Sequence, residues 1–431
     1  MTDPVEVRRC AYAAITAVER DGAWSTTAIN DAVDTLADAR DRRFAAHLAY
    51  DTIRWQGPLD VVLGFALERP INRVEPALRR VLHLGLHQLL HMRVEAHAAV
   101  DTSVELAKTV VPRKRARAAA AFVNGVLRNV GRHPEWSQPP DEVLDSAGHL
   151  AYVTAHPVWI VDELLNRFDR QRVCDILVAD NDAPGVTLRA VGHRDELIEQ
   201  LRLAGHDAQP GRSEYAIRVP GADPRRLRAV ATGQAVVQDE ASMRVVEALG
   251  LRPGDRILDL CAGPGGKAAY AAQLAQPGGT VVAVEFHHHR ATLIEQLARR
   301  LNVPIEVHTG DARTWDGSGG PFDIVLVDAP CTGLGTGRRR PEVRWRRTPG
   351  DITALAQLQH ELLDAASRQV RSGGRLGYAV CTWTAAETVE VIDRFTQSHP
   401  RFAIQHQRQL WPDLDGTDGM FFAVLEDGNH R

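Results

Sequence analysis

From residue 236 onward, short apolar runs alternate with segments of helical periodicity, and this alternation constrains the fold more than any other feature of the chain. A long helix is expected at 351–371. Strands and helices that alternate in this way form a parallel sheet with helices on both faces, so the predicted fold class is α/β. The apolar runs are RILDL (256–260), TVVAVE (280–285), IEVHTG (305–310), FDIVLVD (322–328), RLGYAV (375–380) and MFFAVLE (420–426).

The chain before this region divides into two further parts. Over residues 1–132 apolar residues recur every three or four positions, as in VEPALRRVLHLGLHQLLHM, which predicts an all-helical domain. The proline-rich stretch at 131–142 predicts a linker. Residues 143–235 combine a helix near WIVDELLNRF with strands near GVTLRAV and EYAIRV, which predicts a small α+β connecting domain. The third domain then covers 236–431.

Composition places the chain among soluble globular proteins. Its 431 residues suffice for two or three domains, with 44% hydrophobic and 25% charged residues. Apolar stretches are too short to span a bilayer, and the N-terminus lacks a signal-peptide core. Five cysteines without close CxxC spacing favour reduced thiols over disulfides or a zinc site. We therefore expect a cytoplasmic protein with no metal and no membrane contact.

Although the net charge is only −4, basic residues cluster in three places, PRKRAR (112–117), RRLR (225–228) and residues 338–347. The stretch RRRPEVRWRR places six arginines and a tryptophan within residues 338–347. Guanidinium groups pair with phosphates and an aromatic ring stacks on a base, so we predict nucleic-acid contact here over a merely solvated face. The predicted RNA-binding residues are Arg338, Arg339, Arg340, Arg344, Arg346 and Arg347.

The first predicted strand runs into a glycine-rich turn, DLCAGPGGKAAY at 259–270. A Walker phosphate loop fails, because positions 261 and 268 lack the required glycine and hydroxyl residue. A dinucleotide loop matches formally as GxGxxA, but Pro264 removes a backbone N–H that would bind the pyrophosphate. The turn suits a cofactor without phosphates better.

S-adenosyl-L-methionine is such a cofactor, and its ribose hydroxyls need an acidic residue at a strand end. Asp259, Glu285 and Asp311 follow three successive predicted strands, at the edge where such sheets bind ligands. Glu285 is expected at the ribose, and Asp311 near the adenine. Lys267 is one of only three lysines beside 48 arginines, which favours a specific use of its compact ammonium group next to the turn.

Two cysteines stand directly after buried strands, in DAPCTGLG (328–335) and YAVCT (378–382). Together with DLCAGPGGK, VVQDEASM and DGMFFAVLE, these motifs resemble the bacterial 16S ribosomal RNA cytosine-C5 methyltransferases that carry a NusB-like N-terminal domain. In the helical part, DRRFAAHLAYDTIRW, LHLGLHQLLHM and FVNGVLRN are similar to the antitermination factor NusB, an RNA-binding fold. The resemblance covers nearly the whole chain.

The resemblance implies a class I, Rossmann-like methyltransferase domain and a role for each motif residue. Cys381 is then the nucleophile, Cys331 assists product release, Asp328 holds the protonated N3 of the base, and Lys267 belongs to the catalytic group. The implied cofactor residues are Cys261, Ala262, Gly263, Pro264, Gly265, Gly266, Lys267, Glu285, Asp311 and Asp328. The chain departs from the family where Val380 replaces threonine and Gly263 replaces alanine, and the first change bears on how the catalytic turn is held.

The chemistry of cytosine explains why two thiols are needed. Carbon 5 is too poor a nucleophile to attack a methyl donor, so a thiolate first adds to carbon 6. After methyl transfer a base must remove the proton from carbon 5, which allows the thiolate to leave. In the doubly wound order that the resemblance implies, the two cysteine-bearing strand ends are neighbours, so Cys331 and Cys381 are expected to face one pocket.

Three other functions remain open at this stage. A transfer RNA substrate would use the same catalytic motifs, and only the NusB-like region favours 16S rRNA. A non-catalytic RNA-binding assembly factor would not need the cysteine pair. An NAD-dependent oxidoreductase would use the glycine turn but leaves both cysteine motifs unexplained. We expect a monomer, with RNA as the partner.

Overall fold

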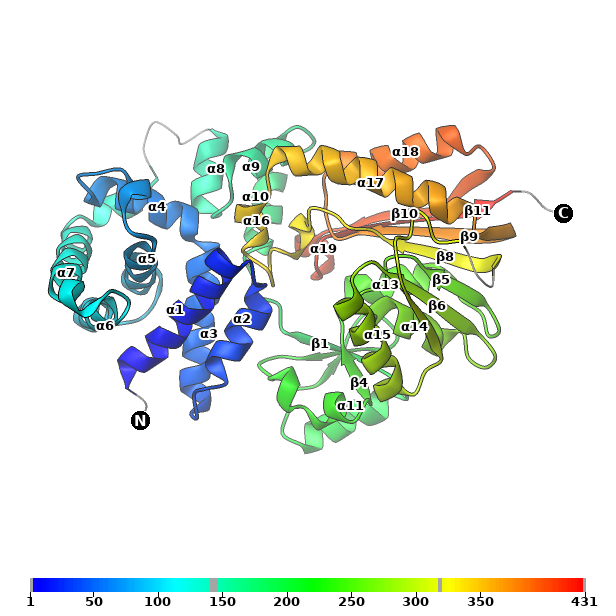
Figure 1. The fold of residues 1–431 in the computed structure, drawn as a ribbon, viewed down its shortest axis with the longest axis horizontal. Helices are drawn as coiled ribbons and strands as arrows, with labels where there is room; N and C mark the ends of the chain where they lie inside the picture. The colour runs from blue at the N-terminus through cyan, green and yellow to red at the C-terminus, as the bar shows by residue number, and fades with distance from the viewer. Residues whose placement is uncertain (1–2, 140–145, 317–319, 429–431) are drawn as a thin grey trace. The chain divides into compact units, whose positions relative to one another are not determined.

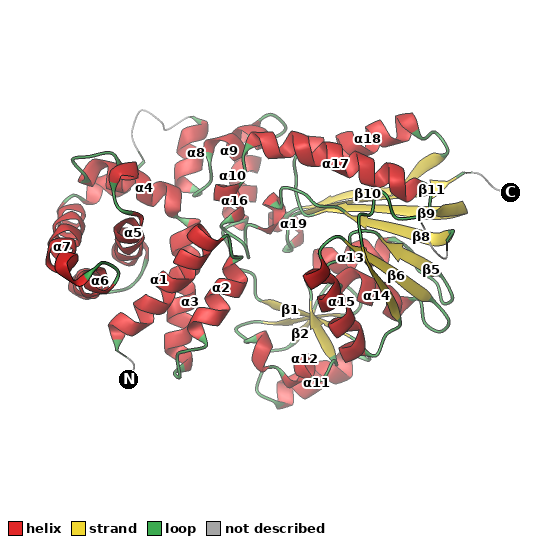
Figure 2. Ribbon diagram, viewed as in Figure 1, coloured by secondary structure: helices red, strands yellow, loops and turns green. Residues whose placement is uncertain are grey.

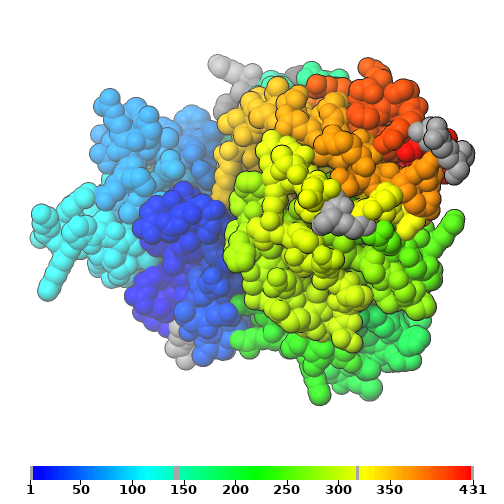
Figure 3. Space-filling model, turned by 45° about the vertical axis from the view of Figure 1, so that its right-hand side comes forward, coloured from blue at the N-terminus to red at the C-terminus, as the bar shows by residue number. Residues whose placement is uncertain are grey.

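The computed structural model describes residues 3–139, 146–316 and 320–428 (Figure 3, where the others are grey). By its internal contacts the chain forms two compact units. Unit 1 contains Met1–Asn181 and Gly337–Arg346, and unit 2 contains Asp182–Thr336 and Arg347–Arg431. The end of the predicted linker, residues 140–142, lies outside the described residues.

Unit 1 is helical throughout its described part, and for residues 1–132 the periodicity predicts this (Figure 1, where these residues are blue to cyan). Helix ends follow ordinary capping chemistry: the Asp38 side chain accepts the N–H groups of Arg40 and Asp41, and Gly22 ends the first helix at φ 71°. One apolar core joins the first seven helices. The helices are α1 (Pro4–Asp21), α2 (Ser25–Val33), α3 (Ala39–Arg54), α4 (Gln56–Ala66), α5 (Pro76–His91), α6 (Ala96–Thr109), α7 (Ala116–Arg132), α8 (Ala147–Val153), α9 (Val158–Leu165) and α10 (Arg170–Ala179).

A ten-residue excursion of the chain, Gly337–Arg346, belongs to unit 1 although the residues on both sides belong to unit 2. It contains the short helix α16 (Val343–Arg346). Arg344 is 2% exposed and donates to Asp180 Oδ2 at 2.7 Å, Asn181 Oδ1 at 2.7 Å and the Ala155 carbonyl at 3.0 Å. These contacts fasten the excursion to the loops around α8 and α10.

Unit 2 begins with a small antiparallel sheet in the order β2-β3-β1-β4. Leu188 and Ile217 face each other in its apolar core, which also takes one side of α11. The elements are β1 (Val186–Ala190), α11 (Arg194–Leu203), β2 (Gln209–Pro210), β3 (Ala216–Val219), α12 (Arg228–Ala231) and β4 (Ala235–Val237).

The rest of unit 2 is an α/β layer structure around a sheet in the order β10-β11-β9-β8-β5-β6-β7 (Figure 2). Strands β9 to β7 in this order are parallel, and β11 is antiparallel to both of its neighbours. Separate apolar clusters cover the two faces, one with α13, α14 and α15, the other with α17 and α18. The strands are β5 (Arg256–Asp259), β6 (Thr280–Glu285), β7 (Ile305–Thr309), β8 (Phe322–Asp328), β9 (Val370–Val380), β10 (Phe402–Leu410) and β11 (Met420–Asp427). The helices are α13 (Glu240–Ala248), α14 (Gly266–Leu274), α15 (His288–Leu301), α17 (Pro349–Ser367), α18 (Val389–Ser398) and α19 (Pro412–Asp415).

This strand order determines where a ligand site can form. Successive strands are added on one side of β5 as β6 and β7, and on its other side as β8 and β9. The direction of winding therefore changes between β5 and β8, and the carboxyl ends of strands at such a point flank a crevice. The segments that follow Asp259, Asp328 and Val380 all start at this edge.

Three features differ from the sequence expectations. Helix α17 ends at Ser367, and β9 already begins at Val370, inside the segment expected to be helical to 371. Strand β10 has no counterpart among the predicted strands, because it lies at the sheet edge and residues 403–408 are exposed and largely polar. The predicted connecting region 143–235 is shared between units, its helices in unit 1 and its strands in unit 2.

We predict that Arg344→Ala lowers the stability of unit 1 by about 3–5 kcal/mol, because Asp180 then stays buried without its cationic partner. His156, which contacts Asp180 Oδ2 at 3.2 Å, does not replace that cation at neutral pH, because burial, the main cause that lowers its pKa, persists in the variant. Chemical denaturation of the full chain, with hydrogen exchange in α10 as the unit 1 signal, measures the loss.

Arg340→Ala is the matched control. Arg340 is exposed, and its guanidinium lies 4.8 Å from the Trp24 ring centre, so the expected cost is below about 1 kcal/mol. The Arg344→Ala loss should shrink at acidic pH, because His156 is then free of the Arg344 charge and can protonate and pair with Asp180. Equal losses in the two variants would contradict the anchoring role of Arg344.

Candidate active site

The glycine-rich turn connects β5 to α14 and is built around close backbone approaches. Gly265 caps α14 at φ 106°, a conformation that favours glycine. The N–H of Gly263 donates to Glu285 Oε2 at 3.1 Å. A Cβ atom at Gly263 would lie only 2.1 Å from the same oxygen, so alanine at this position requires Glu285 to move. Glycine at position 263, where the family usually has alanine, therefore allows the Glu285 carboxylate to lie against the turn.

Glu285 ends β6 and is 3% exposed, with its carboxylate turned toward the glycine turn. It also accepts the N–H of His287 at 2.9 Å and lies 3.4 Å from the guanidinium of Arg290. Arg290 donates in turn to the Gly263 carbonyl, so it links the acid to the turn. No sequence motif points to Arg290; its only signal is a basic residue in the first turn of the helix that follows the acid.

Asp311 follows β7, beside the end of β6, where the N–H of Gly310 donates to the Glu285 carbonyl at 3.0 Å. Its carboxylate pairs with Arg313 at 2.7 Å. The hydrogen bond from Arg313 lowers the pKa of Asp311. The predicted acids after β6 and β7 therefore lie at neighbouring strand ends, and Asp311 already has a cationic partner.

The buried Lys267 and the half-buried Asp328 form an ion pair across the crevice, with Nζ and Oδ2 2.7 Å apart. Burial disfavours the charge on Lys267, but the Asp328 carboxylate outweighs burial and raises the lysine pKa. Asp259 is 1% exposed, and burial together with Asp328 raises its pKa to about 7. Two of the strand-end acids, Asp328 and Asp259, thus act on the charge of one lysine.

The two cysteines that follow β8 and β9 meet in space. Parallel pairing aligns Asp328 with Ala379, and the Sγ atoms of Cys331 and Cys381 are 3.3 Å apart. The hydrogen bond to Cys381, reinforced by burial, raises the pKa of Cys331 well above that of a free thiol. Val380, which stands where the family usually has threonine, is buried among apolar side chains of the sheet.

The arginines of residues 338–347 differ in their burial and in their contacts. Arg344 is enclosed by unit 1, so its guanidinium is committed to protein acceptors, and we withdraw it from the predicted RNA-binding set. Arg346 is exposed but donates to the carbonyls of Val18 and Gly22, while Arg338 and Arg339 are half-buried. A guanidinium in the interior cannot be told from a solvated one by charge clustering alone.

Arg347, the last residue of this stretch, contacts the first cysteine turn. Its Nε donates to the Thr332 carbonyl at 2.9 Å and its Nη2 to the Cys331 carbonyl at 3.3 Å. Arg347 therefore supports the backbone on which the Cys331 thiol is mounted.

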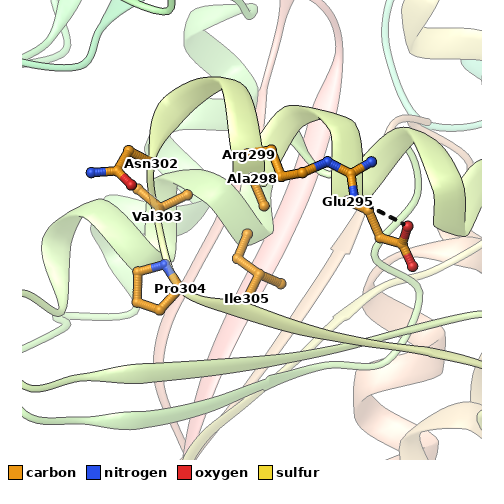
Figure 4. Close-up of a pocket in the computed structure, with 7 residues that line it drawn as sticks. All are labelled: Glu295, Ala298, Arg299, Asn302, Val303, Pro304 and Ile305. Carbon is orange, nitrogen blue, oxygen red and sulfur yellow. Dashed lines mark ion pairs between the residues drawn. The ribbon is translucent and has the colours of Figure 1, made fainter.

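The hollow at β7 lies apart from the predicted site. A hollow of about 500 Å³ at the amino end of β7 is lined by Glu295, Ala298, Arg299, Asn302, Val303, Pro304 and Ile305 (Figure 4). It lies at the opposite end of that strand from Asp311 and holds no residue of the predicted site. Across the described ranges, no group of His, Cys, Asp and Glu side chains is arranged to hold a metal ion. Among the same residues, no helix is long and apolar enough to cross a membrane.

Comparison with known proteins agrees with this geometry. The family of 16S rRNA methyltransferases RsmB/F matches residues 246–426, and the NusB family matches residues 5–132. A Mycobacterium tuberculosis protein, which carries a provisional methyltransferase name, is 42% identical and covers 97% of this chain and 96% of its own length. Ribosomal RNA small subunit methyltransferase B of Vibrio vulnificus is 33% identical over 98% of this chain and 99% of its own.

Among solved structures, the crystal structure of PH0851 shares the fold, with a TM-score of 0.85 and 24% identity over 99% of both chains. The α/β methyltransferase fold and the NusB-like region that the sequence predicts are confirmed. The chain therefore belongs to the RsmB/F family of 16S rRNA methyltransferases, with an N-terminal region of the NusB family.

Proposed function

We propose that this protein transfers a methyl group from S-adenosyl-L-methionine to carbon 5 of a cytosine in 16S rRNA, through a covalent bond between Cys381 and carbon 6. The observation that carries the proposal is the 3.3 Å contact between the sulfur atoms of Cys331 and Cys381, which come from the turns after two adjacent strands. Cytosine C5 methylation needs two such groups, one to add and one to remove a proton.

The glycine turn and the strand-end acids fit S-adenosyl-L-methionine. Glu285 provides a carboxylate for the two ribose hydroxyls, and the N–H of Gly263 holds that carboxylate against the glycine turn. The Oδ2 atom of Asp259 is buried and has no hydrogen-bond partner among the described residues, so it is available to a donor of the ligand. The bound cofactor would supply an electrophilic methyl group beside Cys381.

The raised pKa of Cys331 suits a role in the later step, the removal of the proton. Cys331 keeps its proton while its thiol faces Cys381. When Cys381 bonds to carbon 6, the negative charge and the hydrogen-bond acceptor next to Cys331 are lost. The pKa of Cys331 then falls, and its thiolate becomes available to take the proton from carbon 5. Asp328, held by Lys267, faces the same crevice and would hold the protonated N3 of the base.

The substrate assignment depends on the N-terminal region and the relatives. The NusB family match covers residues 5–132, and several relatives are named for the small ribosomal subunit, which favours 16S rRNA over transfer RNA. The exposed Arg340 and Arg346, with the half-buried Arg338, Arg339 and Arg347, remain the proposed phosphate contacts of the arginine stretch.

Glu285→Ala should weaken cofactor binding by about 1–3 kcal/mol, because hydrogen bonds to a charged acceptor are lost. Titration calorimetry with S-adenosyl-L-methionine measures the change. Asp323→Ala is the control, since Asp323 caps the opposite end of the sheet through Arg256 and Arg371. Unchanged affinity in Glu285→Ala would remove Glu285 from the cofactor site.

Cys381→Ala should bind cofactor but neither methylate RNA nor form an adduct, because it cannot attack carbon 6. Cys331→Ala should methylate once and then stall as a covalent protein–RNA complex, visible on a denaturing gel. The RNA must present an accessible cytosine, since the base has to leave its stack. Adducts in Cys381→Ala alone would reverse the two roles, and full activity in both variants would refute the thiol mechanism.

Cys331 should react slowly with iodoacetamide at pH 8 and faster only above about pH 9, because the neutral thiol predominates until its raised pKa is approached. Mass spectrometry of the labelled peptides gives the rate at each pH. In Cys381→Ala the main cause of the raised pKa is gone, so labelling of Cys331 should shift to lower pH. An identical pH profile in both proteins would contradict the coupling between the thiols.

A further inference from the structure

A glutamate outside the recognised motifs lies between the two cysteine turns. Glu387 ends a 3₁₀ turn, Ala385–Glu387, six residues after Cys381, and is fully buried. Its Oε1 atom accepts the backbone N–H of Thr332 at 2.7 Å and the amide of Gln359 at 3.2 Å. Its Oε2 atom accepts the hydroxyls of Thr332 at 2.6 Å and Thr384 at 2.8 Å.

These donors come from both thiol-bearing turns. Thr332 follows Cys331 directly, and Thr382, which follows Cys381, contacts Glu387 Oε2 at 3.3 Å and the Thr332 hydroxyl at 2.8 Å. The backbone of Glu387 is held as well, because the buried Tyr378 hydroxyl donates to its carbonyl at 2.7 Å. One carboxyl group is thus bonded to the residue after each cysteine.

A carboxyl group in this position is costly unless donors surround it, and an apolar side chain would fill the same space without that cost. Capping its own turn requires only Thr384. The additional donors on the Cys331 side lie 55 residues earlier in the chain, so they do nothing for the local turn. What they achieve is a fixed separation between the two turns.

We propose that Glu387 is a positioning residue that holds the Cys331 and Cys381 thiols in mutual register. The inference rests on the proposed function, in which one thiol bonds carbon 6 while the other reaches the proton on the adjacent carbon 5. Both groups must stay within a few ångströms of neighbouring ring atoms, and small displacements of reacting groups reduce rates strongly. Loss of register should affect proton removal first, because it needs both turns at once.

The test uses the full chain and reads the sulfur contact without RNA. Diamide oxidises two neighbouring thiols to a disulfide and is itself reduced to the hydrazine, and the rate reports how often the sulfurs meet. Glu387→Gln places an amide N–H₂ against N–H and hydroxyl donors, so we expect Cys331–Cys381 disulfide formation to slow at least tenfold, as quantified by peptide mass spectrometry. Turnover on RNA should fall by a similar factor, with KM for RNA unchanged and a stalled adduct present.

Two comparisons separate positioning from general damage. Thr384→Val removes one hydroxyl donor and should slow crosslinking, whereas Thr384→Ser keeps the hydroxyl and should restore it; this pair serves also if Glu387→Gln fails to fold. Glu240→Gln is the matched buried glutamate, since Glu240 accepts from Arg212, Ser213 and Arg218 in the small sheet, and it should crosslink as the unmodified protein does.

Unchanged crosslinking and turnover in Glu387→Gln, or in Thr384→Val if the first variant does not fold, would overturn the inference. Equal slowing in Glu240→Gln would overturn it too, because the effect would then reflect general loosening. Slowed crosslinking in a protein that methylates a different RNA base would leave the positioning role standing and refute only the proposed function.

Discussion

The parallel pairing of β8 with β9 is the constraint on which the site depends. Because Asp328 lies opposite Ala379, the residues that follow the two strands emerge at the same level of the sheet edge. The N–H of Ala329 donates to the Ala379 carbonyl at 2.9 Å, and that of Gly335 donates to the Cys381 carbonyl at 3.0 Å, so the pairing continues beyond the strands into the turns. A shift of one residue would turn the side chains of either strand to the opposite face. The contact between two cysteines fifty residues apart is therefore a property of the sheet register as much as of the cysteines.

Sequence patterns predict a strand well when both of its faces are buried, and poorly when the strand lies at the exposed edge of the sheet. Strands such as β6 and β8 are nearly continuous apolar runs with polar residues at their ends, and both are found at the predicted residues. Strand β10 escapes prediction because one row of its backbone groups lies at the sheet edge, where polar residues such as Gln405 and Arg408 are compatible with pairing. The start of β9 is missed for another reason: Gly373 and Gly374 resemble a break in a strand, but the strand passes through them.

Some site residues can be recognised from the sequence and others cannot, and the difference is how common the residue type is in this chain. Cys331, Cys381 and Lys267 are rare residue types at strand or turn ends, and their placement is informative even for a single sequence. Arginine is abundant, so neither the enclosure of Arg344 by Asp180 nor the support of the Cys331 turn by Arg347 can be read from the chain. Glu387 is concealed for a similar reason, because its partners are threonines, and hydroxyl groups near a glutamate are common on any surface.

The electrostatics of the crevice explain why a lysine stands where almost every other basic residue is an arginine. Asp259, Asp328 and Glu285 end three strands that share one edge, and burial, with the charges of Asp328 and Glu285 added to it, raises the pKa of Asp259 to about 7. A guanidinium would pair with one of these acids through a planar fork and fill the space beside it. The compact ammonium of Lys267 neutralises Asp328 from a buried position and also carries its charge close enough to Cys381 for each to influence the other. One small cation thus interacts with an acid and a thiol together.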